Sequence, residues 1–367
     1  MSNKIVYLNL LSEEDIGVRK KVNYQCKAFK NLDYKVVQMS RKDYTTFLYK
    51  LESKSNGIIK KFLKIFSSVL LLKKTDNKKY FQKEDVLYIR YFMSSPILIN
   101  YLKKLKEIGV KIIIEIPTYP YDQEIKKETL RSKWDKKYRF ELYKYVDKIV
   151  TYSNDKEIWG IPCINISNGI DLDEVKIVNK KRKDINKIIF TSVSNCSFWH
   201  GIDRFLNSLL EYKKNGGEKE IIFNIVGEGT ETSKLKSIVE DNPILKESVI
   251  FHGFKSGMGL DEIYNNTDIA VGSLGIHRII GLKEVQPLKN REYCAKGIPF
   301  IISFKDPDFI DKEFVYNNIS NDDRLFDICK IIEWYKNLKI TSKEMREYSK
   351  QFSWDIQIKK VIDNIGD

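Results

Sequence analysis

The chain is 367 residues long, more than one hydrophobic core usually organises, so its length predicts two domains. Hydrophobic residues make up 42% and charged residues 31% of the chain, a balance that excludes a disordered or low-complexity protein. The net charge of +14 is concentrated in one half, because residues 1–175 hold 34 lysines and arginines against 22 aspartates and glutamates, or +12.

The cysteines and the apolar runs indicate where the protein works. Five widely spaced cysteines with no CxxC pair argue against a disulfide framework and a structural zinc site, and favour a reducing cytoplasm. The N-terminal apolar run is too short for a signal peptide, and no run of about 18 uncharged apolar residues predicts a membrane-spanning helix. We therefore expect a cytoplasmic protein without a metal site.

Short apolar runs alternate with longer amphipathic stretches from end to end, the pattern of parallel sheets covered by helices on both faces. The predicted strands of the first half are residues 5–10, 35–39, 86–90, 111–116, 148–152 and 163–166. Those of the second half are residues 187–193, 220–226, 249–251, 268–273 and 299–302. This order predicts an α/β protein with two successive doubly wound units of the Rossmann type.

Residues 57–74 predict a helix that carries Lys60, Lys61 and Lys64 beside apolar residues at helical spacing. Such a helix can lie in a membrane interface, with its apolar side in the acyl boundary and its lysines at anionic headgroups. The same composition also fits an ordinary covering helix with a lysine-rich outer face. The positive charge of the first half favours the membrane interpretation.

The boundary between the domains is expected at residues 171–186, where the lysine-rich stretch 179–186 has little to bury and predicts a solvated linker. We place one Rossmann-like domain in residues 1–175 and a second in residues 176–350. A terminal helix in residues 351–367 is predicted from apolar residues at helical spacing.

The most informative stretch is residues 268–303. A predicted strand ends near Ser273, a loop rich in glycine and cations follows, and a helix begins near Pro287 and ends at Gly297. A helix N-terminus at the carboxyl ends of parallel strands offers free N–H groups and a positive dipole to an anion. The sequence therefore predicts a phosphate at residues 288–292, with Glu292 placed to accept from two vicinal hydroxyls of a ribose.

Glu284 and Glu292 are separated by seven residues, and with residues 292–300 they resemble the acidic motif of retaining glycosyltransferases of family four. Those enzymes have the GT-B fold, two facing Rossmann-like domains with a cleft between them. The resemblance extends along nearly the whole chain. Further stretches that resemble family segments are residues 14–21, 167–171, 198–204, 225–229, 251–254 and 352–355.

The resemblance implies roles for the parts of the chain. Residues 1–175 would bind the acceptor, residues 176–350 the nucleotide sugar, and residues 351–367 would pack back on the first domain. Donor contacts are expected from Glu292, Gly17, His200, Gly201, Gly227, His252, His277 and Leu288, and a sugar-hydroxyl contact from Glu284. The loop at residues 115–122 puts carboxylates and phenols at the same rim, and its Glu115, Tyr119 and Asp122 are the expected acceptor contacts.

One departure from the family concerns the donor diphosphate. The family usually supplies an arginine and a lysine from the first loop of the nucleotide domain, but here that loop, residues 194–200, contains neither. A buried diphosphate needs positive partners. His277, Arg278, Lys283 and Lys289 follow in the later loop and helix start, and a protonated His200 would add one more. We predict Arg278 and Lys289 as the catalytic cations.

The function that follows is a retaining hexosyltransferase that needs neither a metal ion nor a cofactor beyond its nucleoside-diphosphate sugar. In the family it resembles, the leaving phosphate oxygen takes the acceptor's proton on the same face, so catalysis would rest on positioning and charge stabilisation. The expected acceptor is a polyprenyl-diphosphate-linked glycan of a bacterial surface polysaccharide. We expect a cytoplasmic enzyme in peripheral contact with the inner face of the plasma membrane.

Other interpretations remain open. A nucleic-acid binder would explain the positive charge but leaves the acidic motif unexplained. A GT-B phosphorylase or sugar-nucleotide epimerase shares the fold, and a non-catalytic GT-B partner subunit would explain the missing arginine and lysine. Glu292 also fits a solvated helix residue near Lys289, and lone histidines are often structural. Gly227 and Gly229 lack the third glycine of a dinucleotide fingerprint, so NAD is not expected.

Overall fold

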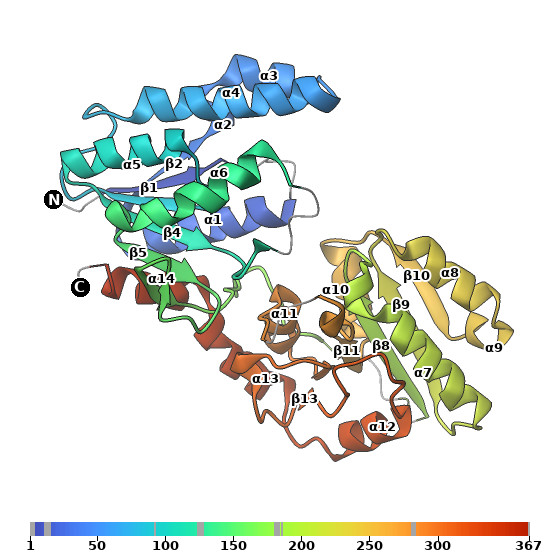
Figure 1. The fold of residues 1–367 in the computed structure, drawn as a ribbon. Coiled ribbons are helices and arrows are strands. Elements are labelled where there is room, and N and C mark those ends of the chain that lie inside the picture. The colour runs from blue at the N-terminus through green and yellow to red at the C-terminus, as the bar shows by residue number, and fades with distance from the viewer. Residues whose placement is uncertain are drawn as a thin grey trace. The chain divides into compact units, whose positions relative to one another are not determined.

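The computed structural model describes residues 4–10, 16–91, 93–122, 128–179, 184, 186–279 and 284–365. The chain divides into two compact units, one formed by Met1–Ser167 with Trp354–Asp367 and the other by Asn168–Ser353 (Figure 1). The segment 11–15, most of the expected linker at 179–186 and the candidate cation Lys283 lie outside the described residues.

The first unit contains a seven-stranded sheet in the order β2-β1-β3-β4-β5-β7-β6. Neighbouring strands are parallel, apart from the antiparallel pair β6 and β7. The strands are β1 (Lys4–Asn9), β2 (Lys35–Ser40), β3 (Val86–Arg90), β4 (Lys111–Ile116), β5 (Lys148–Thr151), β6 (Glu157–Ile158) and β7 (Ile161–Asn165). The helices are α1 (Ile16–Asn31), α2 (Arg41–Tyr44), α3 (Thr46–Ser53), α4 (Gly57–Thr75), α5 (Pro96–Ile108), α6 (Leu130–Tyr138), the 3₁₀ helix η2 (Arg139–Lys144) and α14 (Trp354–Asp363).

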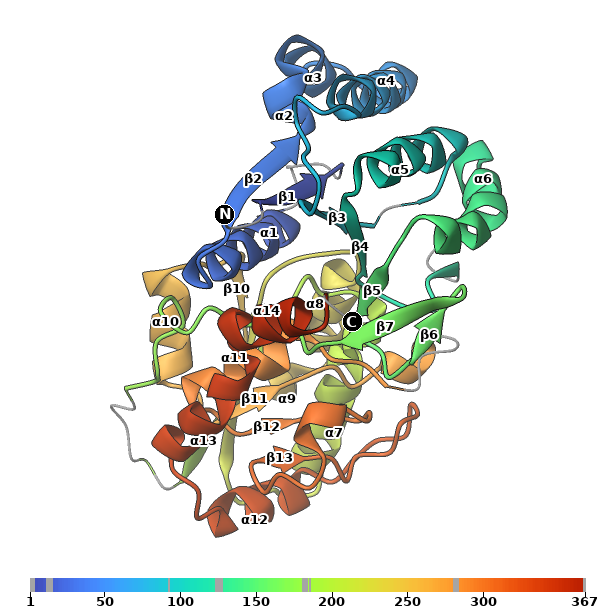
Figure 2. The same cartoon turned by 90° about the vertical axis from the view of Figure 1, so that its left-hand side faces the viewer.

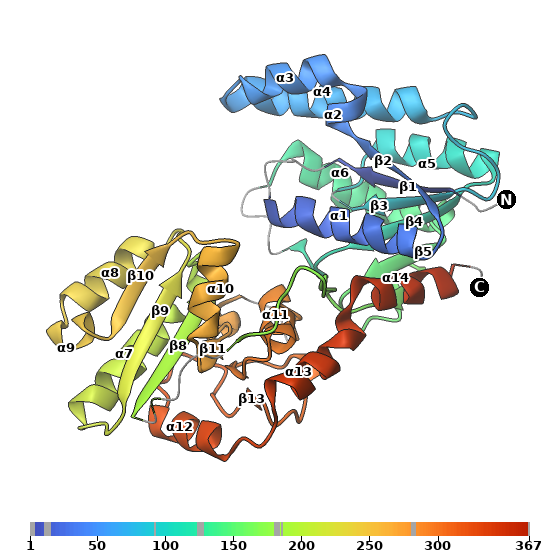
Figure 3. The same ribbon diagram turned by 180° about the vertical axis from the view of Figure 1, so that it is seen from behind.

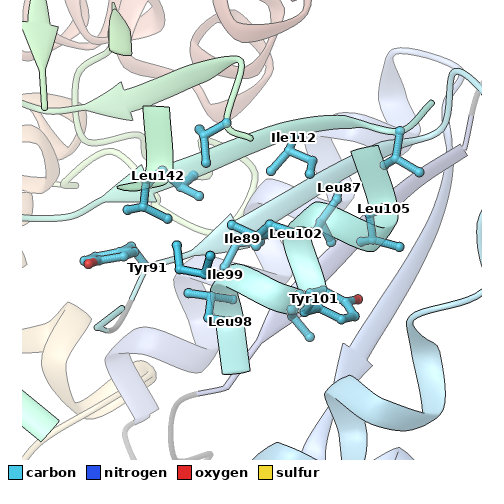
Figure 4. Close-up of a cluster of buried hydrophobic side chains, with 14 of the residues drawn as sticks. Leu87, Ile89, Tyr91, Leu98, Ile99, Tyr101, Leu102, Leu105, Ile112 and Leu142 are labelled. Atoms are coloured by element: carbon cyan, nitrogen blue, oxygen red, sulfur yellow. The ribbon is translucent and has the colours of Figure 1, made fainter. Parts of the chain in front are cut away.

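Alternating side chains of each strand reach two separate cores, because successive residues of a strand point to opposite faces. On one face, Leu87 and Ile89 of β3 pack with Leu102 of α5 (Figure 4). On the other face, Tyr88 of the same strand packs in a cluster with side chains of α1 and with Trp354 of α14. The C-terminal helix therefore belongs to the core of the first unit.

The second unit contains a six-stranded parallel sheet in the order β10-β9-β8-β11-β12-β13. Its strands are β8 (Lys187–Val193), β9 (Glu220–Val226), β10 (Val249–Gly253), β11 (Ile269–Val271), β12 (Phe300–Ile301) and β13 (Val315–Tyr316). Its helices are η3 (Phe198–His200), α7 (Ile202–Lys214), α8 (Thr232–Glu240), α9 (Pro243–Lys246), α10 (Met258–Asn265), η4 (Ile276–Arg278), α11 (Leu288–Lys296), η5 (Pro307–Phe309), α12 (Ile328–Asn337), α13 (Ser342–Ser349) and η6 (Lys350–Phe352).

Helices cover both faces of this second sheet (Figure 2). Residues of α7, α8 and α12 form one core with the strands, and residues of α11 and α13 form the other. Numbered within the unit, the strand order is 3-2-1-4-5-6, that of a dinucleotide-binding Rossmann sheet. The order reverses between β8 and β11, which makes the carboxyl ends of these two strands the place where such sheets bind ligands.

The two doubly wound units confirm the predicted fold class. Each predicted strand overlaps an observed one, but β6 and β13 were not predicted, because strands of two residues leave no periodic signal in the sequence. The predicted terminal helix is α14. Among the residues that the structure describes, no helix has the length and apolar character that crossing a membrane would require.

Candidate functional site

Two loops of the second unit lie together at the carboxyl ends of β8 and β11. The carbonyl of His200, in the loop after β8, accepts a hydrogen bond of 2.9 Å from the backbone N–H of Leu274, in the loop after β11. Gly201 has a φ of +62°, and a Cβ there would fall 2.6 Å from the carbonyl carbon of Leu274. Glycine is required at this position because the two backbones touch. This close contact explains Gly201 without a role in donor binding.

Helix α11 begins just beyond these loops, as the sequence predicted. It starts after Pro287, whose side chain offers no acceptor to the first helical N–H groups, and ends at Gly297 in the left-handed conformation. The side-chain amide of Asn168 donates a hydrogen bond of 2.6 Å to the carbonyl of Gln286 and so fixes the approach to the helix. The N-terminus of α11 is thereby held in place with a positive dipole directed at the loops.

Lys289, in the first turn of α11, carries the most unusual charge of this region. Its side-chain nitrogen is fully buried, although the residue as a whole is partly exposed, and among the described residues it has no hydrogen-bond partner. Burial lowers the pKa of Lys289 to about 7, and the Cys196 thiol acts in the opposite direction. A buried ammonium without a partner is costly, so the site favours the entry of an anion.

His200 faces the same region in a neutral state. Its Nδ1 accepts a hydrogen bond of 3.0 Å from the backbone N–H of Ser197, which places the ring proton on Nε2. Burial and the nearby ammonium of Lys289 lower the pKa of His200 to about 2. This environment disfavours the imidazolium, so the prediction of a protonated His200 beside the phosphates gains no support from the structure. In its neutral form, His200 can donate a hydrogen bond from Nε2.

Glu292 lies one turn further along α11 and is half-buried. Burial and the nearby carboxylate of Glu292 raise the pKa of Tyr264, a buried residue of α10, well above its usual range, so the two groups lie close together. Its partial burial beside this tyrosine distinguishes Glu292 from a fully solvated surface residue. Tyr264 was not singled out from the sequence, because a tyrosine at helical spacing indicates a core residue and nothing more.

Glu284, the other member of the acidic pair, already has an ion-pair partner. Its carboxylate lies 2.5 Å from the ammonium of Lys305, and the backbones of these two residues form a parallel bridge. Arg291 of α11 is fully buried, and two nitrogens of its guanidinium bind the carboxylate of Asp306, one of them at 2.8 Å. These contacts tie the segment before α11 to the loop that follows β12.

Arg278 does not have the arrangement expected of a catalytic cation. Its guanidinium binds the carboxylate of Asp203 at 2.9 Å and that of Asp323 at 2.6 Å, and it donates to the carbonyl of Phe198 at 2.8 Å. His277, on the same 3₁₀ turn, lies 3.0 Å from Asp323. Because two carboxylates already balance the charge of Arg278, the structure leaves Lys289 as the better candidate of the predicted pair.

The glycines after β9 serve the packing of two loops. A Cβ on Gly227 would lie 1.9 Å from the carbonyl oxygen of Ser194, and one on Gly229 would lie 1.6 Å from that of Asn195. Any side chain at either position would push the loop after β9 away from the loop after β8. These two glycines therefore allow the two loops beside the candidate site to pack closely, whether or not their amides contact a ligand.

His252 and Leu288 occupy different surroundings. His252 lies at the end of β10, on the outer edge of the sheet, where its Nε2 is 2.8 Å from the side-chain oxygen of Asn224. Burial and Lys255 lower its pKa. Leu288, the first residue of α11, is exposed. The structure brings Lys289, His200 and Gly201 together at the switch point and leaves His252 two strands away from β8.

In the first unit, Glu115 is fully buried instead of lying at a rim. Its carboxylate contacts Arg90 at 2.7 Å and Lys21 at 3.4 Å, and it accepts hydrogen bonds from Gln25, Tyr88 and Tyr152. Burial alone would raise the pKa of Glu115, but the two cations and the hydrogen bonds lower it to about 2. The expected acceptor contact at Glu115 is thus wrong, because every donor around it belongs to the fold.

The remaining residues predicted in the first unit are more accessible. Tyr119 is half-buried and packs edge-on against Trp159, and Asp122 forms an ion pair of 2.7 Å with Arg139. Gly17 lies exposed in the first turn of α1. In the described part of the chain, no group of three or more histidine, cysteine, aspartate or glutamate side chains is arranged to hold a metal ion.

Comparison with known proteins bears on the same region. Residues 173–308 match the family model described as "Glycosyl transferases group 1". No curated protein sequence matches the chain. Among solved structures, the lipopolysaccharide outer core galactosyltransferase WaaB in its apo form is similar, with 14% identity, a TM-score of 0.61, and coverage of 99% of this chain and 98% of that one.

Two further structures cover the chain as fully. Sucrose-phosphate synthase from Thermosynechococcus elongatus has 14% identity and a TM-score of 0.67, with 98% of each chain covered. HepE from Anabaena, solved with UDP and glucose, has 10% identity and a TM-score of 0.59, with 99% of this chain and 100% of that one covered. At such identities the likeness establishes the fold, and the family match lies over β8 to η5, including all of α11.

These findings confirm the resemblance that the acidic motif and the segments around it indicated. The protein has the GT-B fold, and residues 173–308 of its second unit match the model of the group 1 glycosyltransferases.

Proposed function

We propose that this protein transfers a sugar from a nucleoside-diphosphate sugar to an acceptor with retention of anomeric configuration, and that the start of α11 holds the donor's diphosphate. The observation that carries the proposal is the buried ammonium of Lys289, which has no hydrogen-bond partner among the described residues. Its position in the first turn of a helix adds backbone N–H groups and a dipole to the same place. A diphosphate would satisfy both.

Lys289 supplies what the loop after β8 lacks. The resemblance calls for an arginine and a lysine in residues 194–200, which contain neither. Burial and the ammonium of Lys289 lower the pKa of His200, which supports the placement of a lysine from α11 beside this loop. The proposed site therefore obtains its cation from a different element, at the same switch point of the sheet.

The geometry supports a division of roles within the site. Lys289 and the first amides of α11 would stabilise the negative charge that develops on the departing phosphate. Glu292, which lies near Tyr264, would accept hydrogen bonds from the ribose hydroxyls. Neutral His200 would donate from Nε2 to a phosphate or sugar oxygen.

The reaction needs no base from the protein. The bond between the anomeric carbon and the phosphate oxygen breaks, and the acceptor hydroxyl oxygen forms a new bond to that carbon on the same face. The acceptor's proton passes to the leaving phosphate oxygen, which carries away the bonding electron pair. Positioning and charge stabilisation would then supply the rate enhancement, with no protein metal site assigned to the step.

The proposed acceptor is a lipid-linked glycan, with polyprenyl diphosphate as the carrier. The supporting observation is the charge of residues 1–175, which contain 34 basic and 22 acidic residues. A basic surface attracts both the anionic carrier and an anionic leaflet. We accordingly propose peripheral contact with the inner face of the plasma membrane. WaaB, a similar structure, is described as a lipopolysaccharide outer core galactosyltransferase, which concerns a surface glycan.

A panel of UDP-, GDP- and TDP-sugars tests the donor site first. The matching donor should raise the melting temperature of the purified protein, because a ligand that binds only the native state stabilises it. The same donor should then label a polyprenyl-diphosphate glycan acceptor, and product analysis should show a retained anomeric configuration. Stabilisation without transfer or donor hydrolysis would instead favour a non-catalytic partner subunit, which the missing arginine and lysine also suggest.

A further inference from the structure

Helix α4 turns its apolar side away from the protein. Over its first three turns, large apolar side chains are exposed to solvent, with Ile58 at 85% and Phe62 at 64%. Ile59, Ile65 and Phe66 are exposed as well, and the rings of Phe62 and Phe66 stack at 6.1 Å. Ile58, Phe62, Ile65 and Phe66 follow the spacing of one helical stripe. We call the exposed side chains of Ile58, Ile59, Phe62, Ile65 and Phe66 the α4 face.

This orientation is the reverse of that of a covering helix with a lysine-rich outer side. Lys60 and Lys64 lie on the opposite side of the helix from Phe62 and are half-buried, whereas the α4 face is open. The second half of α4 behaves normally, since Leu71 and Thr75 are buried and the hydroxyl of Thr75 lies 3.3 Å from that of Tyr101 on α5. Helices α3 and α4 form an outer layer of the first unit beyond α5 (Figure 3).

The α4 face is not needed to hold the helix in place. Arg41, at the start of α2, is buried with an ion-pair partner in Glu52 of α3, and it donates a hydrogen bond of 3.2 Å to Ser67 of α4. Helix α3 exposes two more apolar side chains, Phe47 and Leu51. A buried polar contact thus fixes the helices while their apolar side chains remain available. An exposed apolar patch on a rigid element is typical of an interaction surface.

The charge around this surface identifies the partner. Residues 54–75 contain six lysines and no acidic residue. A second copy of the chain would bring two sets of these lysines together, which like-charge repulsion opposes. A helix with one apolar side and with lysines outside that side fits the surface of an anionic bilayer. Its apolar side enters the acyl boundary, and its ammonium groups remain at the headgroups.

We infer that the α4 face, with Phe47 and Leu51 of α3, inserts into the surface of an anionic bilayer and docks the first unit on it. This docking rests on the proposed function, because a docked first unit would meet a polyprenyl-linked acceptor in the membrane. It does not depend on the donor site, which lies in the second unit.

Co-sedimentation with vesicles tests the inference on the full chain. The protein should bind vesicles of phosphatidylcholine with phosphatidylglycerol, bind phosphatidylcholine alone more weakly, and lose affinity with added salt. The double variant Ile58→Asp, Phe62→Asp should weaken binding to the anionic vesicles by roughly a hundredfold, because two aspartates replace inserted side chains. Ile244→Asp, a matched change at an exposed residue of α9 in the second unit, should leave binding unchanged.

Folding and donor binding provide the controls. The double variant should keep its circular dichroism spectrum and its stabilisation by the donor, so a failed donor site and a failed docking surface give different results. Equal vesicle binding by wild type and double variant, or no wild-type binding to anionic vesicles, would overturn the inference. So would a wild-type dimer that the double variant dissociates, since the face would then belong to a second copy. The α4 face would also be misassigned if a soluble acidic protein bound it in place of the vesicles.

Discussion

Lys289 and His200 come from different elements of the second unit, yet burial and the ammonium of Lys289 together lower the pKa of His200 to about 2. One residue is therefore a neutral donor and the other a cation whose own pKa is lowered to about 7. Because both groups respond to the same electrostatic environment, an anion entering between α11 and the loop after β8 should change the protonation of Lys289.

Replacement of Lys289 by methionine should stabilise the protein and impair its ligand site together. Methionine removes a buried ammonium that has no hydrogen-bond partner among the described residues, so the melting temperature without ligand should rise. Affinity for the matching nucleoside diphosphate should fall by roughly a hundredfold, in line with the loss of one charge-stabilising donor. Thermal denaturation and calorimetric titration measure the two effects.

Lys296 provides a matched control on the same helix. It is also buried, but its ammonium lies 2.7 Å from the carboxylate of Asp261. Lys296→Met should therefore lower the melting temperature, because it leaves that carboxylate without its cation. If Lys289→Met also lowered the melting temperature, Lys289 would have a partner within the fold, and its assignment to a ligand would be wrong.

Binding of the diphosphate should be linked to proton uptake. The folded protein holds the pKa of Lys289 at about 7, whereas a lysine in the unfolded chain titrates near 10.4. Between these values the unfolded chain binds more protons, so this group makes the free energy of unfolding rise with pH over that window. A bound diphosphate raises the pKa of the lysine again, so binding above pH 7 should take up close to one proton at Lys289.

Calorimetry in buffers with different ionisation enthalpies measures this proton. The uptake should approach one per bound nucleotide in mildly alkaline solution and be absent in Lys289→Met. Lys21, whose pKa burial also lowers to about 7, contributes to the pH dependence of stability but lies in the first unit. Its replacement should leave ligand-linked uptake unchanged. Equal proton uptake by wild type and Lys289→Met would contradict the assignment.

Glu292→Gln should reduce the affinity for nucleoside diphosphates more than it reduces the affinity for inorganic diphosphate, which lacks a ribose. The carboxylate is expected to accept from two hydroxyls, and a carboxamide accepts less strongly. Tyr264→Phe removes a hydroxyl that lies close to the Glu292 carboxylate and should give a smaller effect in the same direction. Equal losses for both ligands would place Glu292 outside the ribose site. Competition binding against a fluorescent nucleotide compares the variants.

Arg278→Gln should affect stability and leave donor affinity unchanged. The substitution breaks ion pairs with Asp203 and Asp323, so the melting temperature should fall. Donor titration of the folded variant is the critical measurement. A large loss of affinity in Arg278→Gln would show that this guanidinium exchanges its carboxylates for the donor, and would restore its predicted catalytic role.

Glu115→Gln should destabilise the first unit by about 3 to 5 kcal/mol, because it leaves Lys21 and Arg90 buried without their carboxylate. Chemical denaturation monitored by circular dichroism measures this loss. Donor binding to the second unit should persist under conditions where the variant is folded. A variant as stable as wild type would mean that the fold does not depend on this buried ion-pair network.

The sequence predicted the elements whose signals are local. The α11 boundaries followed from Pro287 and Gly297, and the order of the apolar runs led to two doubly wound sheets. The partners of Arg278 could not be predicted in this way, since Asp203 and Asp323 lie 75 and 45 residues away in the chain. Which of several cations in one loop faces a ligand depends on such distant contacts.

Burial was also difficult to predict for single polar residues. Glu115 is preceded by three isoleucines in β4, a run that indicates a strand buried on both faces, and this was a usable signal that its side chain is internal. For α4, composition predicted an amphipathic helix but not which side faces outward. That orientation depends on the packing of Ser67 and Thr75 against residues of other helices.

The binding of a diphosphate at the start of α11 through Lys289 is the step on which the proposed function depends. Its most direct test is calorimetric titration of wild type and Lys289→Met with the nucleoside diphosphate of the donor that stabilises the protein. We expect binding to wild type and a roughly hundredfold weaker affinity for the variant, in a protein that melts at a higher temperature without ligand. Equal affinities in two folded proteins would contradict it.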